Sequence, residues 1–236
     1  MSSGVRPGTS TYTFIPEVSV LATFDPLASV AELAEEAGVY SASPDFVREH
    51  CGPRARAILD LVPDDYYAEA ADLGLYPNVD VRVHRLYPGD IPAVPGWHAD
   101  GEFRADWYSQ PDLDKVPVHR HLTATVSTEA GGVSSTEFVA EPFTCAVSSP
   151  SAERTLWSQV HEAIESGGAA RPATISAPDG ELTSFSSWTL HRATPARVRG
   201  WRLFFRMSMW HRPWLGGEGK ISRQEQVYRI FEGQGW

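Results

Sequence analysis

Lysine is almost absent from this chain of 236 residues, which contains only Lys115 and Lys220, so arginine supplies nearly all of its positive charge. The formal net charge of −10 at pH 7 argues against binding to nucleic acid or to an anionic membrane surface, because both require a basic patch. Arginine holds carboxylates and phosphates through two parallel hydrogen bonds, so any arginine predicted to face inward is informative about ligands.

Cysteine and long apolar runs are also scarce. The two cysteines, Cys51 and Cys145, are too few for a disulfide framework and too far apart for a zinc knuckle. No stretch is apolar over the length of a membrane span, and the first 13 residues lack the apolar segment of a secretory signal. We therefore expect a cytoplasmic protein with reduced thiols and no membrane partner.

The composition is sufficient for a substantial core, with 42% hydrophobic and 11% aromatic residues. Residues 1–23 are predicted to be a flexible lead with one short strand at Thr11 to Ile15. Residues 24–236 are expected to form a single domain whose core covers about residues 77–212, since one domain of this size is common among β proteins. The chain shows no internal repeat and no low-complexity tract.

Capping residues and apolar spacing predict four helical stretches. They are expected from Asp25-Pro26 to Gly38, from Ser43-Pro44 past the break at Gly52-Pro53, from Pro63 to Leu73, and from Ser149-Pro150 to Gly167. We expect the first three to pack on the outside of a sheet.

Alternation of apolar and polar residues predicts strands at residues 79–87, 116–128, within 134–148, and at 173–177, 182–193 and 201–210. On the last of these, Arg202, Phe204, Arg206 and Ser208 share one face, and the opposite face is apolar enough to lie under helices. Short strands with turns and a helical cap favour a mainly β fold, with a jelly-roll (double-stranded β-helix) core and N-terminal and inserted flanking helices.

The pair His98 and Asp100 is the strongest candidate for chemistry in this chain. The two residues lie two apart, so their side chains project to the same side of an extended segment. His191, at the end of a predicted strand, is the best candidate for a third ligand. Two imidazoles and one carboxylate on one face of a metal suit ferrous iron, because they leave the opposite positions open.

The ordered combination of His98-x-Asp100, a long gap, His191 and then Arg202 resembles the Fe(II)/2-oxoglutarate-dependent oxygenase superfamily. Trp97-His98-Ala99-Asp100 and the gap to His191 are most similar to its phytanoyl-CoA dioxygenase-like branch. The resemblance covers roughly residues 77–212 and implies a jelly-roll dioxygenase that binds Fe(II) through the His-Asp-His group. It further implies that Arg202 holds 2-oxoglutarate, assisted by the hydroxyl group of Thr123 or Thr125.

The reaction implied by this resemblance consumes O2 and 2-oxoglutarate, releases succinate, and hydroxylates an unactivated C–H bond. Asp100 favours hydroxylation, desaturation or ring formation, because halogenating relatives lack this carboxylate. The expected substrate is a small organic molecule or a short peptide segment. We predict that Arg206 binds an anionic group on it, with His119, Tyr87 and Trp107 as further substrate contacts. Alternatively, Arg206 pairs with an internal acid such as Asp80 or Glu141.

Two other functions fit the same sequence. His119 and His121 could join His191 in a cupin-like metalloenzyme that needs no 2-oxo acid, although Glu129 is too far along the chain for the usual cupin glutamate. The third function is a non-catalytic jelly-roll module whose His and Arg pocket binds a ligand. If Arg202 does not hold the 2-oxo acid, Arg206 or Arg85 would take that role.

Overall fold

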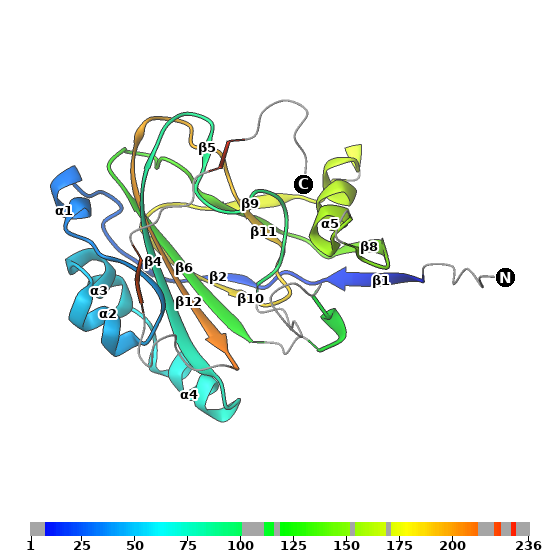
Figure 1. The fold of residues 1–236 in the computed structure, drawn as a ribbon, viewed down its shortest axis with the longest axis horizontal. Helices are drawn as coiled ribbons and strands as arrows, with labels where there is room; N and C mark the ends of the chain where they lie inside the picture. The colour runs from blue at the N-terminus through cyan, green and yellow to red at the C-terminus, as the bar shows by residue number, and fades with distance from the viewer. Residues whose placement is uncertain are drawn as a thin grey trace.

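The computed structural model describes residues 8–100, 111–115, 119–151, 154–168, 171–211, 220–222 and 228–229. The fold is mainly β, and every pair of neighbouring strands is antiparallel. Its largest sheet has seven strands in the order β13-β3-β4-β12-β6-β10-β2, and a three-stranded sheet has the order β11-β7-β9 (Figure 1).

The large sheet consists of β2 (Val18–Thr23), β3 (Gly38–Ala42), β4 (Tyr76–Leu86), β6 (Arg120–Ser127), β10 (Glu181–Ser186), β12 (Gly200–Trp210) and β13 (Lys220–Ser222). The three-stranded sheet consists of β7 (Thr136–Val139), β9 (Thr174–Ala177) and β11 (His191–Ala193). Two further pairs are β1 (Thr9–Phe14) with β8 (Phe143–Ser148), and β5 (Asp90–Ile91) with β14 (Tyr228–Arg229).

Four short helices, α1 (Val30–Ala34), α2 (Pro44–His50), α3 (Pro53–Leu59) and α4 (Asp64–Asp72), lie before β4, and α5 (Leu156–Glu165) lies between β8 and β9. A 3-10 turn covers Leu113–Lys115. Ser43 caps α2 as predicted, by accepting a hydrogen bond from the backbone of Phe46. The first helix begins later than predicted, because Ser29 and Glu32 form a capping box. Asp25 instead accepts a hydrogen bond from Leu27 in a local turn.

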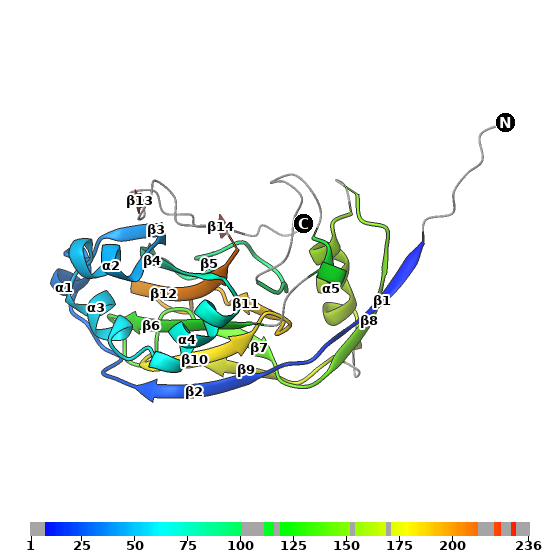
Figure 2. The ribbon, with the colours of Figure 1, turned by 90° about the horizontal axis from the view of Figure 1, so that it is seen from below.

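The main core lies between α1–α4 and one face of the large sheet. The apolar residues of β12 supply part of it, and Leu203, Phe205, Met207 and Met209 are at most 1% exposed. Buried residues of all four helices belong to the same cluster. This arrangement confirms that the helices pack outside the sheet and leaves the opposite face, with Arg202 and Arg206, turned towards the three-stranded sheet (Figure 2).

Two predictions about the strands are wrong. Residues 9–23 are not a flexible lead, because β1 pairs with β8 and β2 forms the edge of the large sheet beside β10. The single strand predicted over residues 182–193 is divided into β10 and β11 by a turn, in which the backbone of Thr189 donates to Ser186. The C-terminal part of the chain, beyond the predicted core, supplies β13 and β14, and β3 begins at Gly38, where the first helical stretch was expected to end. None of the described helices has the length and apolarity to cross a membrane.

Candidate metal centre

His98 and His191, which are far apart in the sequence, meet through their backbones. The amide of His98 donates to the carbonyl of His191 over 3.1 Å, and the amide of His191 donates to the carbonyl of His98 over 2.8 Å. This isolated antiparallel bridge joins the segment after β5 to the first residue of β11. Their imidazole rings consequently lie with centroids 4.6 Å apart.

Each imidazole is oriented by a carbonyl two residues earlier in the chain. The Nδ1 atom of His98 lies 3.0 Å from the carbonyl oxygen of Gly96, and that of His191 lies 3.1 Å from the oxygen of Thr189. A carbonyl oxygen only accepts, so in each neutral ring Nδ1 carries the proton and Nε2 keeps its lone pair. Such an outer hydrogen bond fixes the orientation of a metal-ligating histidine.

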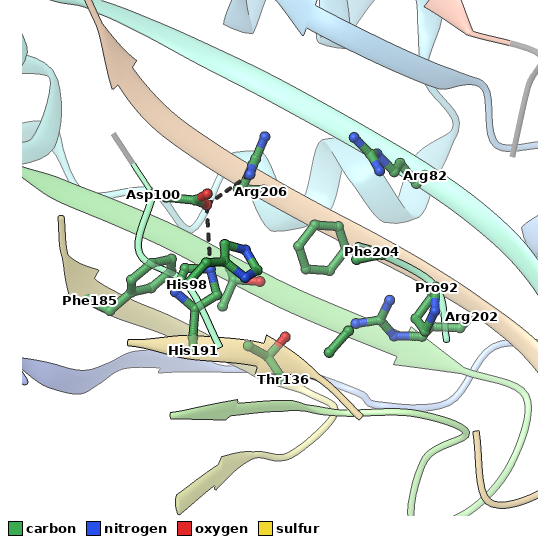
Figure 3. A pocket seen from close by; sticks show the side chains of 13 residues that line it. Arg82, Pro92, His98, Asp100, Thr136, Phe185, His191, Arg202, Phe204 and Arg206 are labelled. Atoms are coloured by element: carbon green, nitrogen blue, oxygen red, sulfur yellow. Dashed lines mark hydrogen bonds and ion pairs between the residues drawn. The ribbon is translucent and has the colours of Figure 1, made fainter. Parts of the chain in front are cut away.

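Asp100 completes a group of three possible ligands (Figure 3). Its Oδ2 atom lies 3.6 Å from Nε2 of His191, and one ligand atom from each of the three residues lies within 4.8 Å of the others. In the described part of the chain, no other three His, Cys, Asp or Glu residues approach one another in this way. The three predicted ligands therefore come together in one place.

The protonation states in this group suit metal binding. Burial raises the pKa of Asp100, but the charge of Arg206 acts in the opposite direction and is the main reason that the pKa lies well below the ordinary value. Burial, together with the charge of His191, lowers the pKa of His98 to about 4. At neutral pH the site therefore offers a carboxylate and an unprotonated imidazole, as a divalent cation requires.

Arg206 is occupied by two acids of the protein itself. One terminal nitrogen donates to Oδ2 of Asp100 over 2.8 Å, and the other donates to Oδ2 of Asp80 over 2.5 Å. The register of β12 on β4 places Arg206 directly opposite Asp80. The alternative of an internal Asp80 pair is therefore confirmed, whereas Glu141 accepts from the backbone of Ala173. Both terminal nitrogens are engaged, which leaves Arg206 poorly placed to anchor a substrate.

Arg202, unlike Arg206, forms no salt bridge with a described residue. Its side chain is buried, with 2% of the residue exposed, and its guanidinium carbon lies 4.9 Å from the centroid of the Phe204 ring. It forms no salt bridge with any residue that the structure describes, and its Nε atom has no hydrogen-bond partner. Burial lowers its pKa to about 10, although the charge of Asp179 acts in the opposite direction. A buried cation that forms no salt bridge is expected to await an anionic ligand.

Arg202, Arg206 and the His-Asp-His group line one pocket between the large and the three-stranded sheets. Its lining also includes Arg82, Pro92, Ala93, Thr123, Thr136, Phe185, Ala193 and Phe204. Thr123 therefore lies where predicted, but its hydroxyl group donates to the backbone of Phe205 over 3.3 Å. Thr125 is not part of the lining and donates to Asp179 over 2.6 Å.

The remaining predicted contacts are not all at this site. Tyr87 lies just beyond the end of β4, where the guanidinium groups of Arg85 and Arg199 lie 5.6 and 5.3 Å from the centroid of its ring, and it is not among the residues that line the pocket. Arg85 is exposed there and does not line the pocket. His119 is buried beside His121, with ring centroids 4.8 Å apart, and does not belong to the ligand group. Trp107 lies outside the described residues.

Asp80 was predicted only as a possible partner of Arg206, and Arg82 was not predicted as a residue of the pocket. Both lie on the face of β4 opposite Val81 and Val83, so the same alternation could have identified them. Thr136 of β7 also lines the pocket and was not predicted. Nothing in the sequence around it indicates this position, because Thr136 reaches the pocket only through the pairing of β7 with β11.

A scan against known protein-family models, a search of curated proteins and a search of solved structures each found no match to this chain.

Proposed function

We propose that this protein is an Fe(II)/2-oxoglutarate-dependent dioxygenase that hydroxylates, or otherwise oxidises, an unactivated C–H bond of a small organic or peptide-like substrate. The observation that carries the proposal is the presence of two features in one pocket. A His98-Asp100-His191 group leaves part of a metal's coordination sphere open, and a buried Arg202 lies beside it without an acid partner.

The fold supports the same proposal. Antiparallel strands form one large and one smaller sheet, with the candidate ligands between them and helices covering the outer face of the large sheet. We interpret this arrangement as a jelly-roll core of the double-stranded β-helix type, flanked by α1–α4 on one side and by the inserted α5.

Each residue of the candidate site has a distinct role in the proposed reaction. His98, Asp100 and His191 would hold the ferrous ion, and Gly96 and Thr189 keep the imidazoles in the correct tautomer. Arg202 would bind the far carboxylate of 2-oxoglutarate through two parallel hydrogen bonds. When bound, the iron would supply the oxidation chemistry with O2, and succinate would be released.

Arg206 acts through Asp100 as a positioning residue. Its guanidinium keeps Asp100 ionised and, because Asp80 holds its other end, fixes the carboxylate towards His191. Phe185 and Phe204 provide apolar walls that keep water away from the open side of the ligand group. A dry, shaped pocket is the contribution that a protein makes to chemistry carried out by a metal.

The decisive experiment measures oxygen consumption and succinate formation after anaerobic addition of Fe(II) and 2-oxoglutarate. We expect slow formation of succinate even without the substrate, and none in His191→Ala. Arg85→Gln serves as the matched arginine control, because Arg85 is exposed outside the pocket. Oxygen consumption without succinate would favour the cupin-type alternative, and the absence of both would favour a binding module.

Metal analysis tests the ligand group independently of turnover. His98→Ala and His191→Ala are expected to lose Fe(II), whereas His121→Ala is expected to retain it. Full occupancy in either of the first two variants would place the metal elsewhere, most directly at His119 and His121.

A further inference from the structure

Arg82 is a second arginine in the pocket without an acid partner. It lies opposite Phe204 in the register of β4 on β12 and lines the same cavity as the candidate metal ligands. Across the described segments, it forms neither a hydrogen bond nor a salt bridge. Its neighbour Asp80, two residues earlier on the same face, is already taken by Arg206. The pocket therefore has an available guanidinium beyond the one assigned to 2-oxoglutarate.

Phe204 separates this guanidinium from Arg202. Arg202 stacks on the ring of Phe204, and in the view of Figure 3 Arg82 lies above that ring and Arg202 below it. Their depths also differ, because Arg202 is buried and Arg82 is partly exposed. A small dicarboxylate bound at Arg202 would lie in the deeper part of the pocket, on the far side of the ring from Arg82. The two arginines are thus arranged for two different anions.

Tyr40 lies on β3, the strand that pairs with the strand of Arg82, and carries a hydroxyl group. In the pairing of β3 with β4, Val39 lies opposite Val81 in the helix-side core, so alternation turns Tyr40 to the face that carries Asp80 and Arg82. Burial and the charge of Asp80 raise the pKa of Tyr40, while the charges of Arg206 and Arg82 act in the opposite direction. No described residue forms a hydrogen bond with its hydroxyl group.

We propose that Arg82, assisted by the hydroxyl group of Tyr40, binds a carboxylate or phosphate group of the substrate. The proposal rests on the oxygenase function proposed above and narrows its substrate to an anion. Guanidinium and phenol together offer several hydrogen-bond donors, which suits either anion, and the nearby carboxylate of Asp80 is paired with Arg206. Arg206, the residue first expected in this role, cannot supply it while both its terminal nitrogens bind acids.

The position of Arg82 also limits the size of the substrate. Phe204, opposite Arg82, is two residues from Arg206, which corresponds to roughly 7 Å along a strand. Arg206 in turn contacts the candidate metal ligand Asp100. An anionic group held by Arg82 would therefore leave only a few bonds between that group and the carbon atom that is oxidised.

The test follows the Nε–H signals of individual arginines by NMR in the metal-free protein, so it needs no turnover. Arg82→Gln and Arg202→Met assign the two signals, and the exposed Arg85 provides an internal control. The probes are acetate, inorganic phosphate and 2-oxoglutarate, each titrated separately. We expect acetate or phosphate to shift the Arg82 signal with saturation, 2-oxoglutarate to shift the Arg202 signal at lower concentration, and the Arg85 signal to stay in place.

Tyr40→Phe is expected to weaken the binding of the preferred probe at Arg82 at least about tenfold, as loss of one hydrogen bond to a charged ligand implies. Whichever of acetate and phosphate binds more tightly at Arg82 indicates whether the substrate carries a carboxylate or a phosphate. If neither shifts the Arg82 signal, or if 2-oxoglutarate shifts it with the same affinity as the Arg202 signal, the proposal is overturned. If the simple anions shift Arg82 while 2-oxoglutarate leaves Arg202 unchanged, the anion site stands and the oxygenase function fails.

Discussion

Arg206→Gln tests the electrostatic design of the site most directly. In the wild-type protein one guanidinium neutralises Asp80 and Asp100, which approach it from different segments. Glutamine keeps most of the side chain but removes the charge, so two carboxylates remain close together in a largely buried place. We expect the metal-free variant to lose stability for this reason, and not because packing is lost.

The size of the loss follows from the burial of the three side chains. The exposed fractions are 22% for Arg206, 17% for Asp100 and 10% for Asp80, so solvent screens the charges only slightly. Removing one partner of a buried ion pair costs about 3–5 kcal/mol. Allowing for the partial exposure, we expect about 3 kcal/mol, which corresponds to a melting temperature lower by roughly 6–12 °C in a chain of this size.

Thermal unfolding measures the loss of stability in the metal-free variant, and the same experiment with Mn(II) measures how much of that loss a bound cation restores. A divalent cation would restore positive charge at Asp100, so Mn(II) should raise the melting temperature of Arg206→Gln more than that of the wild type. Arg85→Gln is the matched control, because its exposed guanidinium forms no pair with a buried acid. A loss below about 1 kcal/mol in the metal-free variant, the size of a surface pair, would refute the claim that Arg206 neutralises two buried acids.

Three further predictions follow from individual residues. Arg202→Met should leave the melting temperature of the ligand-free protein unchanged or higher, because it replaces a buried cation that lacks an acid partner; a clear decrease would reveal a partner. Burial raises the pKa of Glu36 above 4.5, so the free energy of unfolding should fall as the pH rises from 4.5 through the raised pKa, and Glu36→Gln should abolish that fall; parallel pH profiles would contradict this. Gly180→Ala should cost at least about 2 kcal/mol in chemical denaturation, because φ is +83° and a Cβ atom would lie 2.7 Å from the carbonyl oxygen of Phe24; wild-type stability would exclude this turn geometry.

The parts of the fold that the sequence predicted are those with two chemically different faces. In β12 the alternation of Arg202 and Arg206 with Leu203 and Phe205 shows both the strand and the direction of each side chain. In β2 the same period is invisible, because its residues are exposed or only partly buried on both faces at an edge of the sheet. Edge strands depend on pairing with a distant neighbour, here β10, and local sequence contains little information about that pairing.

The candidate site shows the same division between local and long-range information. The spacing of His98 and Asp100 is local and is visible in the chain, and the fold brings His191 to them as expected. The partners of Arg206 were uncertain because Asp80 lies 126 residues away, and the choice between internal acids depends on the register of β12 against β4. A shift of two residues in that register would have given Arg206 a different neighbour on the same face.

The three arginines of the pocket differ in their hydrogen-bond partners, and this difference distinguishes their roles. Arg206 has two acids, whereas Arg202 and Arg82 have none within hydrogen-bonding distance in the described segments. An arginine that holds acids in place contributes to the ligand-free fold, while a buried arginine without an acid weakens that fold until an anion arrives. Burial of such an unpaired charge destabilises the ligand-free protein. An anion that binds to Arg202 in the folded state should therefore stabilise the fold by the free energy of that binding. If Arg202 holds 2-oxoglutarate as proposed, we therefore expect 2-oxoglutarate to raise the melting temperature of the protein, and we expect this stabilisation to disappear in Arg202→Met.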